Sequence, residues 1–62
     1  MKIEIEYVRY TGYYYAVDMD TYNGDHCGSS QNKLHAVLEL LEVLQENEVY
    51  TEQEILDYLG VK

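Results

Sequence analysis

Two alternating stretches of sequence, residues 2–10 and 13–22, constrain the fold of this chain more than any other feature. In the first, isoleucine and tyrosine alternate with glutamate, and this period of two is typical of a half-buried strand. The second alternates in the same way, and its tyrosine and valine residues also favour a strand. Because so few residues separate the two stretches, they predict an antiparallel hairpin.

The register of this hairpin is predicted from its loop. A two-residue loop at Thr11 and Gly12 would mix apolar and acidic residues on each face, whereas a three-residue loop over 10–12 keeps one face apolar. The three-residue loop places Gly12 in the left-handed position of a type I turn with a G1 bulge. The expected pairs are Tyr7 with Tyr15, Ile5 with Val17 and Ile3 with Met19 on the apolar face, and Lys2 with Asp20, Glu4 with Asp18 and Glu6 with Ala16 on the open face.

The middle of the chain predicts a third strand and a long helix. An Asn-Gly dipeptide at 23–24 is a strong hairpin signal and precedes a short strand over 25–28. Ser29 or Ser30 offers an N-cap for a helix that continues to about Glu46. The apolar arc of this helix covers more than half of its circumference. We expect the arc to lie between the sheet and a second helix, or else to form a homodimer or partner contact.

A second, shorter helix is predicted at the C-terminal end. Thr51 and Glu54 have the spacing of a capping box, and Tyr50 and Ile55 occupy the positions of a hydrophobic staple. Gly60 is placed as the glycine that ends the helix. The predicted fold class is therefore α+β, a single domain over residues 1–62. An antiparallel sheet of about three strands, in β-β-β-α-α order, is covered on one face by two helices.

Composition narrows the function. Twelve acidic residues against four basic ones give a formal net charge of −8, which argues against direct binding to nucleic acid and favours a basic partner. The alternative is that the charge only keeps a small protein soluble. One cysteine allows no internal disulfide and fits a reducing compartment. With no signal peptide and no stretch long enough to span a bilayer, we expect a cytoplasmic protein without a membrane partner.

We expect no enzyme. His26 and Cys27 supply a base and a nucleophile, but neighbouring strand residues point to opposite faces and are poorly placed to act together. A metal site would need further ligands beside these two, with His35 as the remaining soft candidate. We therefore expect no catalytic residue, no metal site and no cofactor.

Two acidic stripes are the candidate partner-binding sites. Like charges at these spacings destabilise a strand pair or a helix, so a sequence selected for stability alone would have placed lysine among them. The alternative is a solvated face on a generally acidic protein. The candidate residues are Glu4, Glu6, Tyr14, Asp18, Asp20 and Tyr22 on the open sheet face, and Glu39, Glu42 and Glu46 on the long helix.

Two resemblances extend this interpretation. The segment 12–20, followed by Gly24, Gly28 and a capped helix, resembles the N-terminal pattern of HicB-type antitoxins. This resemblance implies a sheet domain that binds a small toxin, and it transfers no functional residue. The small size, acidity and tyrosine content of the chain resemble phage-encoded inhibitors such as anti-CRISPR proteins and other nucleic-acid mimics. That resemblance implies an inhibitor that occupies the nucleic-acid site on the basic surface of a partner.

Overall fold

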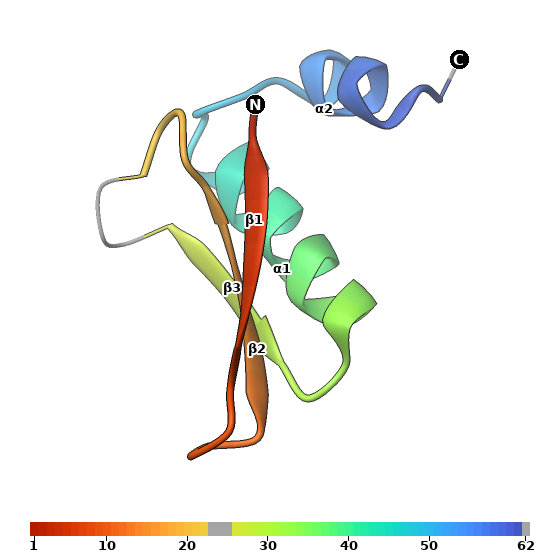
Figure 1. Ribbon diagram of the computed structural model, residues 1–62. Coiled ribbons are helices and arrows are strands. Elements are labelled where there is room, and N and C mark those ends of the chain that lie inside the picture. The colour runs from red at the N-terminus through yellow and green to blue at the C-terminus, as the bar shows by residue number, and fades with distance from the viewer. Residues whose placement is uncertain (23–25, 62) are drawn as a thin grey trace.

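A computed structural model describes residues 1–22 and 26–61 of the chain. The described residues form a three-stranded antiparallel sheet followed by two helices, so the predicted α+β class and β-β-β-α-α order are confirmed (Figure 1). The predicted turn at 23–24 lies outside the described residues. The elements are β1 (Ile3–Val8), β2 (Tyr13–Asp18), β3 (Cys27–Ser30), α1 (Lys33–Glu46) and α2 (Glu52–Leu59).

The core lies between one face of the sheet and α1. The sheet has the order β1-β2-β3, and α1 packs mainly over β3 and β2. Ala16 of β2 is completely buried against Ala36, Leu40 and Leu44 of α1. A Cβ atom on Gly28 would clash with the backbone of α1 at residues 36 and 40, so the helix can approach β3 this closely only over a glycine. Small residues therefore decide which face of the sheet the helix covers.

The helix α2 departs from the expected arrangement. It was expected to cover the sheet beside α1, but it extends away from the sheet near the N-terminal end of β1 (Figure 1). Between the helices, Glu48 adopts a left-handed conformation with φ 57°, which turns the chain out of the direction of α1. Only Ile55 of α2 is buried, whereas Tyr58 and Leu59 remain about half exposed, so this helix covers little of the sheet.

The predicted register of the hairpin is wrong by one residue. Val8 pairs with Tyr13, and a four-residue loop over 9–12 connects them. The backbone N–H groups of residues 11 and 12 both donate to the Val8 carbonyl, at 3.1 and 2.8 Å, and the loop ends at Gly12. Gly12 has φ 76°, so its predicted left-handed conformation is confirmed although the loop is longer than expected.

This shift turns β2 over relative to the prediction. Ile5 lies opposite Ala16 instead of Val17, and Glu4 lies opposite Val17 instead of Asp18. The residues of β2 that face α1 are Tyr14, Ala16 and Asp18, and those that face away are Tyr13, Tyr15 and Val17. Tyrosine or valine at the central position would prevent the close approach of α1 that Ala16 allows.

The helix ends are a mixture of confirmed and corrected predictions. Helix α1 begins after Asn32, whose side chain accepts a hydrogen bond from the N–H of residue 35, and not after either serine. Ser30 lies in β3, which is displaced by two residues from its predicted range. The capping box of Thr51 and Glu54 is confirmed, and Gly60 has the left-handed conformation that ends α2, with φ 77°.

Candidate functional site

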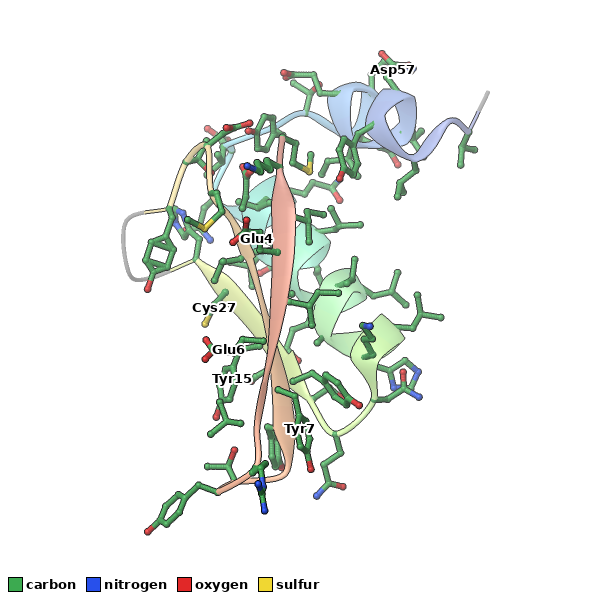
Figure 2. The ribbon with its side chains drawn as sticks, viewed as in Figure 1. Glu4, Glu6, Tyr7, Tyr15, Cys27 and Asp57 are labelled. Carbon is green, nitrogen blue, oxygen red and sulfur yellow. The ribbon has the colours of Figure 1, made fainter. Side chains whose placement is uncertain are left out.

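The face of the sheet that α1 leaves uncovered carries the candidate site. We call this surface the outer face. Glu4 and Glu6 project onto it from β1, and Tyr15 and Cys27 project onto the same side from β2 and β3 (Figure 2). An open hollow of about 470 Å³ lies along this side, and Ile5 borders it as well, although its side chain belongs to the inner face. The lining residues are Glu4, Ile5, Glu6, Tyr15, Val17, Met19 and Tyr22.

The chemistry of the outer face suits a cationic side chain. Glu4 and Glu6 are both exposed, and within the described ranges neither forms an ion pair. Glu6 lies directly opposite Tyr15, so a carboxylate and an aromatic ring stand side by side across the strands. A guanidinium or ammonium group would be stabilised by both neighbours. It would donate charge-assisted hydrogen bonds to the carboxylate and form a cation–π contact with the face of the ring.

Asp18 does not belong to this surface. The expected Glu4–Asp18 pair is absent because the shifted register turns Asp18 to the inner face, where it is 1% exposed. Its carboxylate accepts four hydrogen bonds. The donors are the Lys2 N–H (2.8 Å), the Asp20 N–H (3.2 Å), the Thr21 hydroxyl (2.8 Å) and the Tyr50 hydroxyl (2.8 Å). Asp18 therefore holds the N-terminal end of β1, the end of β2 and the start of the α2 segment together.

These hydrogen bonds shift the pKa values of both Asp18 and Tyr50, whose bond spans more of the sequence than the other three. Burial acts to raise the pKa of Asp18, but the four donated hydrogen bonds outweigh it and hold the pKa below its usual value of 3.8. The hydrogen bond to Asp18, together with burial and the nearby negative charge, raises the pKa of Tyr50 to about 12. The charged carboxylate and the neutral phenol are thus the stable pair at neutral pH.

The other predicted residues of the sheet stripe are divided between the two faces. Tyr14 is half-buried on the inner face, where its ring lies 4.8 Å from that of Tyr7, so it leaves the candidate site. Asp20 is exposed and pairs with the N-terminal amine at 3.1 Å. Tyr22 lines the hollow. Tyr15 and Val17 were missed by sequence reasoning because the predicted register placed them in the core.

The acidic stripe of α1 forms a separate surface. Glu39, Glu42 and Glu46 are exposed, as predicted, but α1 lies on the opposite side of the sheet from the outer face. One flat partner surface cannot contact both stripes. Helix α2 adds little to either, because Glu54 is used in its capping box and Asp57 accepts a hydrogen bond from Gln53 at 2.9 Å.

Comparisons with protein-family models, with curated proteins and with solved structures give no match for this chain. Within residues 1–22 and 26–61, no three histidine, cysteine or acidic side chains come together in a way that could hold a metal ion. No helix in this part of the chain combines the length and apolarity needed to cross a bilayer.

Proposed function

We propose that this chain is a non-enzymatic binding protein that uses its outer face to occupy the nucleic-acid-binding surface of a basic partner, in the manner of anti-CRISPR inhibitors. The observation that carries the proposal is the combination of Glu4 and Glu6 with an exposed hollow lined by Tyr15 and Tyr22. Carboxylates at strand spacing offer negative charge to lysine and arginine, and the flat tyrosine rings can take the place of bases that such sites stack on their own aromatic or guanidinium groups. A cytoplasmic location belongs to the same proposal.

The balance of charges supports this proposal over a merely solvated surface. Two glutamates on one strand, without a basic side chain opposite either, repel one another across the outer face. Their repulsion is relieved when a basic surface covers them. The same charges steer a basic partner toward the outer face before contact, so association should be fast and sensitive to salt.

The test is capture of partners from a lysate of the source cells, followed by a displacement assay on each captured protein. The proposal predicts that the captured protein binds nucleic acid, and that adding this chain releases a labelled nucleic acid from it. Release should weaken as salt is raised, because the Debye length shortens from about 10 Å at 0.1 M salt to about 3 Å at 1 M. A captured protein that keeps its nucleic acid while bound to this chain would contradict the proposal.

An antitoxin-like or self-associating module is the second candidate. It is favoured by apolar side chains that remain exposed on both helices, including Leu34 and Leu38 of α1 and Leu59 of α2. Such side chains fit a small toxin or a second copy of the chain. Capture of a small toxin, or a concentration-dependent dimer in sedimentation experiments, would favour this candidate over the inhibitor.

A further inference from the structure

The strand β1 has a free edge, as β3 does on the other side of the sheet. The sheet order β1-β2-β3 places β1 at one edge of the sheet. No described residue of the chain pairs with the edge of β1 that faces away from β2. In Figure 1, β1 lies in front of the other strands, with its edge open to the viewer. Free edges of this kind accept additional strands from other chains.

The hydrogen-bonding pattern identifies which backbone groups are available. The Lys2 carbonyl accepts from the Met19 N–H at 2.8 Å, which fixes the alternation of bonds between β1 and β2. In an antiparallel pair, every second residue directs its N–H and C=O groups toward the neighbouring strand. Glu4 and Glu6 therefore bond to β2, and the residues that present their backbone groups to the free edge are Ile3, Ile5 and Tyr7.

The two sides of this edge differ in chemistry. On the outer face, Glu4 and Glu6 flank the edge with two exposed carboxylates. On the inner side, Ile5 is 37% and Tyr7 50% exposed, because α1 packs mainly over β2 and β3 and contacts β1 little. An added strand would therefore meet negative charge on one side and apolar surface on the other.

A second copy of the chain fits this edge poorly. Antiparallel pairing of β1 with its own copy through Ile5 places Glu4 opposite Glu6 of the copy, and pairing Ile5 with Tyr7 places Glu6 opposite Glu6. Like charges directly opposite one another destabilise a sheet. Each copy also carries a net charge of −8, so the two chains repel before they meet.

We propose that the β1 edge binds an extended segment of the partner in which basic and apolar residues alternate. Lysine or arginine side chains of that segment lie over Glu4 and Glu6 on the outer face. The intervening apolar side chains lie beside Ile5 and Tyr7 on the inner side, and the backbone groups of β1 complete their hydrogen bonds with the added strand. The proposal rests on the outer face being the partner-binding surface, and it adds the conformation and sequence pattern of the bound segment.

Amide hydrogen exchange followed by NMR tests this proposal on the intact chain. The probe is a synthetic six-residue peptide, matched to the length of β1, in which lysine and valine alternate. The control peptide has the same composition but pairs of adjacent lysines, so that its charges fall on both sides of a strand. The alternating peptide should slow exchange of the Ile3, Ile5 and Tyr7 amides by about tenfold or more, and the control should not.

Two separate proline substitutions, one in each edge strand, test which edge of the sheet binds the peptide. Ile5→Pro removes an N–H that faces the free edge, together with the isoleucine side chain, and leaves the charge unchanged, so it should weaken peptide binding by about tenfold or more. Edge strands tolerate proline at such positions. Ser29→Pro is the matched control at the free edge of β3 and should leave binding unchanged, with circular dichroism checking the fold of both variants.

The possible results separate the two proposals. Equal binding of both peptides, without protection of the three amides, would overturn strand addition and leave the acidic outer face as the binding surface. Loss of binding in Ser29→Pro but not in Ile5→Pro would move the contact to β3 and would also overturn the proposal. If neither peptide binds at low salt, both strand addition and the proposed role of the outer face fail.

Discussion

The acidic residues on the two faces of the sheet have opposite environments. On the inner face, Asp18 is buried and accepts hydrogen bonds from four donors that come from three parts of the chain. On the outer face, Glu4 and Glu6 are exposed, and the described residues offer them no ion pair. Both kinds of carboxylate come from the same hairpin, and sequence reasoning placed Glu4 and Asp18 as direct neighbours.

This difference distinguishes a carboxylate that stabilises the fold from carboxylates that remain free to bind a partner. The hydrogen bonds to Asp18 account for its presence, since a buried carboxylate is stable only when its oxygens have partners. The fold gives no such reason for Glu4 and Glu6, which lie beside an open hollow lined by Tyr15 and Tyr22. We therefore expect substitutions on the inner face to change stability, and substitutions on the outer face to change binding.

The largest expected difference between the faces lies at two adjacent residues of β3. Gly28→Ala puts a methyl group into the backbone of α1 and should lower the free energy of unfolding by about 3 kcal/mol. Ser29→Ala, on the outer face, should change it by less than about 0.5 kcal/mol. Urea denaturation measures both. Equal midpoints for the two variants would show that α1 does not pack on Gly28 as closely as described.

A smaller difference should separate the two carboxylates that were expected to pair. Asp18→Asn places an NH₂ group against donors that need an acceptor and should cost about 2 kcal/mol of unfolding free energy. Glu4→Gln changes an exposed side chain and should be neutral or slightly stabilising, because it relieves repulsion with Glu6. If Glu4→Gln destabilises the protein as much as Asp18→Asn does, the two faces are not distinct in the way we describe.

The pH dependence of stability should identify the Asp18–Tyr50 bond. The pKa of Asp18 is lower in the folded chain than its usual 3.8, so its contribution is present above that pH and is lost as the pH falls through the folded value. The pKa of Tyr50 is raised to about 12, so its contribution is complete below pH 10 and is lost between pH 10 and 12. Thermal melts across both ranges should show these losses. Tyr50→Phe should remove the alkaline loss, and an unchanged alkaline profile in that variant would contradict the assignment.

The smallest effect is expected in α2. Thr51→Ala removes the side chain that caps this helix and should cost roughly 1 kcal/mol, whereas Thr51→Ser keeps the hydroxyl and should cost less. Because α2 packs little against the sheet, the loss should appear mainly as faster amide exchange within residues 52–59. Uniform destabilisation of the whole chain would show that α2 is more firmly joined to the sheet than its contacts indicate.

The sequence was sufficient for features that depend on a few neighbouring residues. The capping box at Thr51, the left-handed Gly12 and Gly60 and the order of the elements were all predicted correctly. Each follows from local backbone chemistry, such as a hydroxyl that caps N–H groups or a conformation that glycine adopts without strain.

The register could not be predicted, because both sides of β2 contain apolar residues. Tyr13, Tyr15 and Val17 form as good an apolar row as Tyr14 and Ala16, so alternation alone does not say which row faces the core. The useful signal was residue size, since Ala16, Gly28 and Ala36 are small enough for a helix to pack closely. The burial of Asp18 depends on Tyr50, which lies 32 residues away, and no local pattern reveals that contact.

Paired charge reversals decide whether the outer face is the binding surface. Asp18 is buried, so reversing its charge would change stability as well as binding. Glu4→Lys with Glu6→Lys therefore tests the outer face, and Glu39→Lys with Glu42→Lys is the matched control on α1. The measurement is the dissociation constant for the captured partner at low and high salt. We predict that the outer-face reversal weakens binding by about 100-fold or more at low salt and leaves the thermal midpoint unchanged or higher, while the α1 reversal changes binding less than about threefold. Unchanged affinity of the outer-face variant, or a larger loss in the α1 variant, would contradict the assignment of the binding surface to the outer face.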